Sequence, residues 1–300
     1  MRVARRMDSF KGYLGTEMNL RLTKMKAEGR DVINLGLGDP DVTPPQHLLD
    51  ALRDAVSHPD HHHYPSFYSI KPLKEAIAGW YGRRFGVELD ANSEVLPLLG
   101  SSEGLFLIHL CLLDVGDIAL VPDPPYPSYE AGVKLAGAKE VGVEFHSLSK
   151  SYNCCGWRTG MLVGNKDVIA GMGKIKSHSD RGMYYPVQVA ATRALNGPID
   201  FMEDRNRDFK ERRDVVVRGL REIGLEVQSP EATFYVWATI PKGHTSQDFC
   251  FEVLERVNVW MIPGSMYGKY GEGYLCIALT HPVERLAEAM GRLKKLAGSE

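Results

Sequence analysis

A lysine stands where an apolar stretch gives way to a polar turn. Residues 141–145 predict a strand, and His146-Ser-Leu-Ser-Lys150 follows it directly. Lysine is rarely found at a buried strand end, because burial disfavours its charged form. A lysine held there would have a lowered pKa and would be a good Schiff-base nucleophile. The residue types alone leave a second interpretation equally open, in which Lys150 is exposed in an ordinary turn.

Anion-binding groups flank this lysine. The hydroxyls of Ser147 and Ser149 precede or adjoin it, and Arg158 follows it in Gly156-Trp-Arg-Thr-Gly160. The guanidinium fork of arginine pairs well with phosphate oxygens. These residues therefore predict an anion site beside Lys150, although Arg158 in a structural ion pair is the alternative.

A second turn also suits a phosphate. Gly100-Ser101-Ser102-Glu-Gly104 lies between a predicted strand at 94–99 and an apolar helix at 105–113. Glycine permits a tight turn, and the free N–H groups at a helix N-terminus bind phosphate. Taken alone, helix capping is the simpler explanation of the glycine and the serines.

The elements that must position these turns alternate along the chain. Strands and helices that alternate through the middle imply an α/β fold with a largely parallel sheet flanked by helices, and the last third predicts a smaller α+β unit. The predicted domains are 46–197 (large) and 1–45 with 198–300 (small). Helices are expected within 1–30 and at 47–57, 71–85, 105–113, 128–136, 166–177, 185–195, 199–223, 245–257 and 282–297. Strands are expected from Val32 and at 94–99, 117–121, 141–145, 160–164, 225–228, 234–239, 258–262 and 274–279.

Composition excludes several functions. A net charge of −2 argues against nucleic-acid binding, and no apolar run is long enough to span a membrane. The basic N-terminus lacks the apolar stretch of a signal peptide, so a cytoplasmic protein is expected. The five widely spaced cysteines suit reduced thiols. The run His61-His62-His63 has no matching ligands nearby and predicts a solvated loop; no metal is expected.

In this order the motifs resemble the class I/II aminotransferase family, whose members have the pyridoxal-phosphate-dependent fold type I. The resemblance covers nearly all of the chain. The motifs at Ala232 (Ala-Thr-Phe-Tyr-Val-Trp) and Pro263 (Pro-Gly-Ser-Met-Tyr-Gly) are similar to those of bacterial aspartate, alanine and diaminopimelate transaminases. The resemblance implies amino transfer between an amino acid and a 2-oxo acid, with pyridoxal 5′-phosphate as cofactor and a homodimer as the assembly.

The resemblance also assigns roles. Lys150 matches the catalytic Schiff-base lysine. Tyr126 matches the aromatic residue that stacks on the pyridine ring, Tyr64 the tyrosine that reaches the phosphate of the neighbouring subunit, and Gly38 the glycine near the substrate carboxylate. The remaining cofactor-binding residues implied are Ser101, Ser102, Ser147, Ser149 and Arg158.

The chain departs from the family between the Tyr126 region and the lysine strand. Relatives carry there an Asn-Pro motif, an aspartate that protonates the pyridine nitrogen and a nearby tyrosine. Here the chain passes directly from Gly137 to Ala138 and has no Asn-Pro. Two or three βα units, roughly 60–90 residues at about 30 per unit, are missing. Their loss is expected to expose apolar helix faces and to leave strands without neighbours.

A second departure is Cys276, which stands where the family has the arginine that clamps the substrate α-carboxylate. Cysteine cannot form that bidentate pair. Arg21, Arg181 or another arginine could substitute, and the sequence gives no reason to choose one. We therefore predict an aminotransferase of reduced activity. The alternatives are a non-catalytic aminotransferase-like remnant and an internally deleted gene product.

Overall fold

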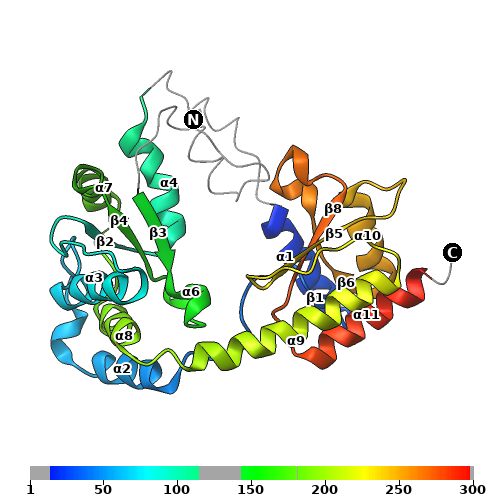
Figure 1. Cartoon of the computed structure of the whole chain (residues 1–300), viewed down its shortest axis with the longest axis horizontal. Coiled ribbons are helices and arrows are strands. Elements are labelled where there is room, and N and C mark those ends of the chain that lie inside the picture. The colour runs from blue at the N-terminus through cyan, green and yellow to red at the C-terminus, as the bar shows by residue number, and fades with distance from the viewer. Residues whose placement is uncertain (1–13, 115–142, 181, 298–300) are drawn as a thin grey trace. The chain divides into compact units, whose positions relative to one another are not determined.

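A computed structural model describes residues 14–114, 143–180 and 182–297. The contacts divide these residues into two units, one formed by residues up to Asp41 together with those from Glu203, and the other by Val42 to Met202. Figure 1 shows both units with their element labels. The predicted strand at 117–121 and helix at 128–136 lie outside the described residues.

The Val42–Met202 unit is built on one three-stranded sheet. Its order is β2 (Val95–Leu98), β4 (Gly160–Gly164), β3 (Val143–Ser147), and β4 runs antiparallel to both neighbours. The two outer strands are therefore parallel to each other. Helices cover both faces of this sheet, which explains why β2 and β4 read as continuous apolar runs.

The side chains of neighbouring strand residues enter different cores, as the alternation of a strand requires. Val95 and Met161 pack with α2 (Gln46–Val56), α3 (Lys71–Phe85) and α8 (Tyr185–Asn196). Leu96 and Leu162 pack on the opposite face with α4 (Ser101–Leu112) and α7 (Lys166–Ser179). Short elements complete the unit: α6 (Leu148–Ser151), η2 (Pro59–His62) and η3 (Cys155–Trp157).

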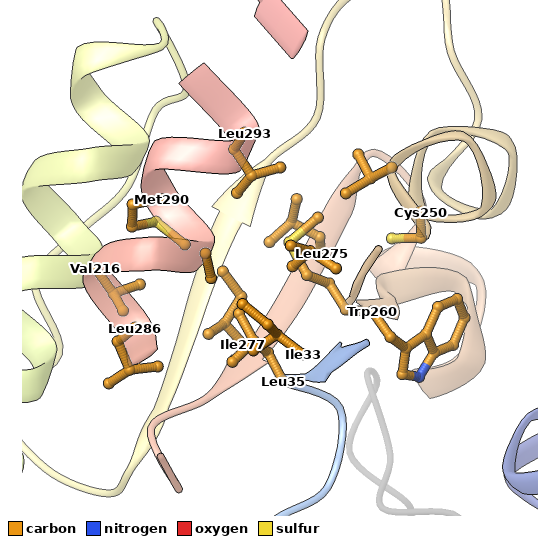
Figure 2. Close-up of a cluster of buried hydrophobic side chains, with 14 of the residues drawn as sticks. Ile33, Leu35, Val216, Cys250, Trp260, Leu275, Ile277, Leu286, Met290 and Leu293 are labelled. Atoms are coloured by element: carbon orange, nitrogen blue, oxygen red, sulfur yellow. The ribbon is translucent and has the colours of Figure 1, made fainter. Parts of the chain in front are cut away.

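The second unit holds most of α9 (Phe201–Glu222) and a separate core. Its strands are β1 (Ile33–Asn34), β5 (Tyr235–Thr239), β6 (Val259–Trp260), β7 (Ile262–Pro263) and β8 (Tyr274–Ala278), and its other helices are α1 (Leu14–Ala27), α10 (Ser246–Val257) and α11 (Val283–Ala297). A three-stranded antiparallel sheet has the order β5–β8–β7, and β1 pairs in parallel with β6. Figure 2 shows the core side chains between these strands and the helices.

One predicted strand is wrong. Residues 225–228 form only an isolated bridge, between Val227 and Ala238. Pro230 follows closely and has no N–H to extend a ladder, so the pairing stops. The predicted strand at 258–262 is divided between β6 and β7, which pair with different neighbours.

The helix α4 exposes apolar surface. Its sequence is apolar on nearly every side, which is typical of a helix buried all round. Yet Leu110 is 47% exposed, and in the described part of the chain β3 pairs with β4 alone. Both features agree with the loss of interior βα units that the sequence predicts.

Candidate active site

Three strand ends meet at one edge of the β2–β4–β3 sheet. Gly160, the first residue of β4, is opposite Leu98 at the end of β2 and opposite Ser147 at the end of β3. The turn that starts at Gly100 and the turn that carries Lys150 therefore leave the sheet at the same edge. Ligands of α/β proteins bind at the carboxyl ends of parallel strands, which is where these two turns begin.

Two glycines allow the turns to approach closely. A Cβ on Gly160 would lie 2.4 Å from the backbone nitrogen of Ser101, and one on Gly100 would lie 2.5 Å from Nη2 of Arg158. Gly100 also has φ +79°, a conformation that favours glycine. The structure thus brings Arg158 and the start of α4 together, as the sequence predicts for an anion site.

The first turn of α4 is held in place by Glu103. Its carboxylate accepts a hydrogen bond from the Leu99 N–H at 2.7 Å, and the buried Lys176 donates to it at 3.0 Å. Lys176 also donates to Asp180 at 2.8 Å. Burial raises the pKa of Glu103. Because Lys176 is shared by Glu103 and Asp180, it offsets only part of their negative charge near the helix start.

The lysine turn is ordered by its serines. Ser147 caps α6, because its Oγ accepts a hydrogen bond from the Ser149 N–H at 3.1 Å. The same hydroxyl donates to the Thr159 carbonyl at 3.3 Å, which ties the turn to the chain entering β4. Ser149 is buried and Lys150 is exposed. Of the two interpretations that the sequence left open, the structure supports the exposed Lys150, so burial does not activate this side chain.

A contact that the sequence did not predict joins Lys150 to Cys155. Nζ of Lys150 donates to Sγ of Cys155 at 3.2 Å, and Nη1 of Arg158 donates to the Cys155 carbonyl at 3.2 Å. Arg158 has φ +53°, the left-handed conformation that ends η3. Cys155 thus lies between the two cations of the predicted site. The only signal in the sequence is its position in the turn, five residues after Lys150.

The other predicted site residues lie elsewhere. Tyr64 belongs to the same unit and is 83% exposed. Gly38 belongs to the other unit, where a Cβ would overlap the Tyr235 hydroxyl. Tyr126 and Arg181 lie outside the described residues. Arg21 forms an ion pair with Glu255 within its own unit.

Cys276 lies in the middle of β8, paired with Trp237 of β5 and Ile262 of β7. It is 2% exposed, and burial raises its pKa to about 12. A neutral thiol in such a place cannot bind a carboxylate by charge. The position that matches the family's arginine is therefore part of the packed interior.

The predicted histidine loop has a structural role. Ring nitrogens of His61 and His62 lie 2.8 Å from the carbonyls of Ala55 and Val56, at the last turn of α2. Histidines favour this place because the carbonyls there have no helical partner. The described ranges contain no group of three or more His, Cys, Asp or Glu side chains placed to hold a metal. None of the helices described is long and apolar enough to cross a membrane.

Comparison with known proteins identifies the family. The model described as aminotransferase class I and II matches residues 30–146 and 140–293, which is most of the chain. The chain belongs to the class I and II aminotransferase family. The predicted resemblance, fold type and enzyme class are thereby confirmed, and the family's cofactor is pyridoxal 5′-phosphate.

Relatives of this aminotransferase match over almost their full length. The LL-diaminopimelate aminotransferase of Desulforudis audaxviator is 36% identical over 383 residues, covering 98% of each chain, and that of Moorella thermoacetica is 35% identical over 386 residues, covering 99% of each. A substrate-bound BacF structure from Bacillus subtilis has a TM-score of 0.93 at 28% identity and covers 99% of this chain and 98% of that one.

The comparison also confirms that the aminotransferase is internally shortened. An alignment of 383 residues exceeds the 300 of this chain, so at least 83 positions have no counterpart in it, within the range predicted. The family model matches in two pieces that meet at residues 140–146, close to the predicted position.

The described residues fit one half of the cofactor. A Cβ on Gly160 would meet the backbone of Gly100 and Ser101, and one on Gly100 would meet the Arg158 guanidinium, so a helix N-terminus and a guanidinium lie close together, as a phosphate site requires. The Asn, Asp and Tyr that would hold the pyridine ring have no counterpart among the described residues. The fit is therefore to the phosphate and to an amine beside it.

Proposed function

We propose that this aminotransferase binds pyridoxal phosphate at the edge where β2 and β3 end and β4 begins. The observation that carries the proposal is the pairing of Gly160 with both Leu98 and Ser147, because it joins the phosphate turn to the lysine turn. When bound, the cofactor supplies the electron sink for amino transfer. The protein holds the cofactor in position and supplies the charged groups around it.

The residues divide this work between them. We assign the phosphate to the N–H groups of Ser101 and Ser102 and to Arg158, since a helix N-terminus and a guanidinium fork both favour a dianion. Ser147 and Ser149 order the turn so that Lys150 reaches outward from α6. The Lys150 amine is then the nucleophile and the base that holds the transferred proton.

The proposed reaction moves an amino group from an amino acid to a 2-oxo acid. Relatives named LL-diaminopimelate aminotransferase make that amino acid the first substrate to test. Because Cys276 cannot clamp a carboxylate and the ring-binding residues have no described counterpart, we expect turnover well below that of full-length relatives. Loss of one charged partner costs on the order of 2–5 kcal/mol in binding.

Three further features extend the proposal. The large domain corresponds to 46–197 and the small domain to 1–45 with 198–300, which is close to the division at Asp41 and Met202. A homodimer would give exposed Tyr64 the neighbouring cofactor phosphate to reach. A cytoplasmic location agrees with free cysteines.

The test is to add pyridoxal phosphate to the purified chain, record the visible spectrum, reduce with borohydride and map the labelled peptide. The expected result is a visible band with the label on Lys150, absent from Lys150→Ala. Label spread over surface lysines such as Lys174 would overturn the site and favour a non-catalytic remnant. Inorganic phosphate is then measured as a competitor of pyridoxal phosphate. Arg158→Met should weaken the binding of both ligands, which tests the phosphate turn separately from the lysine.

A further inference from the structure

Two nucleophiles meet in the lysine turn. Nζ of Lys150 lies 3.2 Å from Sγ of Cys155, and the same sulfur lies 3.3 Å from the carbonyl of Ser149, to which it donates. The two residues are close because a short turn joins α6, which ends at Ser151, to η3, which begins at Cys155. Amino transfer as proposed above uses the amine and gives the thiol no part.

Only one of the two adjacent cysteines is suited to react. Cys154 is buried, its thiol donates to the Leu148 carbonyl at 3.3 Å, and burial raises its pKa to about 12, which keeps it protonated. Cys155 is partly exposed and contacts a cation. Exposure and a neighbouring cation are the conditions under which cysteines become reactive.

We infer that Lys150 and Cys155 together form an aldehyde-capturing site. The neutral amine adds to the aldehyde carbon, the carbonyl oxygen leaves as water, and the thiol adds to the same carbon and gives up its proton. One C–N and one C–S bond form, the C=O bond is lost, and no oxidant or reductant is needed. Two atoms bound to a common carbon lie slightly closer than the observed contact, so only a small side-chain movement is required.

The inference needs the Lys150 amine and the Cys155 thiol and does not depend on cofactor binding. It has a consequence for any aldehyde that reaches this turn. An aldehyde bound by both atoms has a saturated carbon, so the C=N bond that amino transfer needs is removed. Cys155 would hold Lys150 in a stored, inactive form until the thiol leaves again.

Formaldehyde is the direct probe. After brief treatment and proteolysis, we expect one peptide that spans both residues, resists cleavage at Lys150 and carries a single methylene bridge. Because the two groups are already in contact, this bridge should form at least about tenfold faster than a bridge to any other cysteine. The cysteine to compare within the chain is Cys111, which lies on α4 and, like Cys155, is partly exposed.

Matched variants decide the result. Cys155→Ser and Lys150→Arg should each abolish the bridge, and Cys154→Ser should leave it unchanged. Circular dichroism confirms that each variant is folded; since two different variants remove the bridge, failure of one to fold leaves the other. A wild-type chain in which Lys150 is modified while Cys155 remains fully available to iodoacetamide would overturn the inference.

Pyridoxal phosphate gives a second readout. Cys155→Ala should develop a stronger visible band than the wild type, because the thiol no longer removes the C=N bond. If neither protein gives a band but the methylene bridge forms, the cofactor proposal fails and the aldehyde site stands. If bands are equal and no bridge forms, the aldehyde site fails and the cofactor proposal stands.

Discussion

The ammonium group of Lys176 lies 3.0 Å from a carboxylate oxygen of Glu103 and 2.8 Å from one of Asp180. The lysine side chain is 2% exposed, so three charged groups lie together between α4 and α7. Burying charges is costly unless they are paired, which makes this cluster dependent on every member. It lies next to the phosphate turn, because Glu103 also binds the Leu99 N–H.

Replacing Lys176 is therefore expected to destabilise the Val42–Met202 unit. Lys176→Met leaves two partly buried carboxylates without their cation, and the free energy of unfolding should fall by about 3–5 kcal/mol. Urea denaturation measures it. Lys174→Met, at an exposed position on the same helix, should change stability by less than about 0.5 kcal/mol. Equal effects of the two substitutions would show that the buried cluster is not what matters.

The close approach at Gly160 gives a second prediction. Gly160→Ala places a Cβ 2.4 Å from the Ser101 nitrogen and 2.7 Å from the Gly100 carbonyl carbon, and backbone cannot move aside cheaply. Overpacking of this kind costs about 1–3 kcal/mol. If half of that strain falls on the bound state, the affinity for pyridoxal phosphate, followed by fluorescence titration, should fall by roughly two- to tenfold. Gly156→Ala is the control, because a Cβ there meets nothing within 4 Å.

Asp31 gives a prediction about pH. Hydrogen bonds from Arg285 and then Arg292 lower the pKa of Asp31 from 3.8 to about 2. A lowered pKa means that the stabilisation is fully present above pH 3.8 and is lost as the pH falls through about 2. The difference in stability between wild type and Asp31→Asn should thus be largest near neutral pH and vanish in strong acid. Salt should shrink it, because the carboxylate is exposed.

The matched control for this pH series is Asp60→Asn, since Asp60 is exposed at η2 and none of the ion pairs described for the chain includes it. Denaturation at several pH values with each variant separates the two positions. A difference for Asp31→Asn that grows as the pH falls would contradict the assignment of its two arginine partners.

Asn165 provides a test of helix capping. Its Oδ1 accepts hydrogen bonds from the Asp167 and Val168 N–H groups at 2.9 and 3.3 Å, at the start of α7. Asn165→Ala should lower the free energy of unfolding by about 0.5–2 kcal/mol, whereas Asn165→Ser should retain most of it. Thermal or urea denaturation compares the two; identical losses would mean that the cap contributes nothing.

The sequence predicts those elements whose ends carry their own signals. The helix expected at 71–85 begins with Pro72 in its first turn and ends at Gly86, which has φ +68°, and the structure gives it the same bounds. The residues expected to form a strand at 225–228 alternate between apolar and polar types. Whether they pair depends on the neighbouring strand β5 and on Pro230, and the alternation does not show this.

Some features of the candidate site could likewise be predicted from the sequence and others could not. Lys150, Arg158 and the start of α4 are predicted by motifs, since glycines and hydroxyl residues mark turns wherever they occur. The Lys150–Cys155 contact is not, because it depends on how a short helix and a 3-10 turn fold over each other. The exposure of Lys150 is one of two interpretations that the sequence leaves open, because a four-residue helix is too short for a periodic pattern to indicate the direction of a side chain.

The antiparallel strand β4 has a consequence for how much of such a sheet can be lost. It is hydrogen-bonded to β2 on one side and to β3 on the other, so it holds the turn at Gly100 next to the turn that carries Lys150. The units lost near Gly137 and Ala138 are therefore not needed to keep these two turns together. A sheet in which one strand pairs with both site-bearing strands can lose other strands and still keep its site residues side by side.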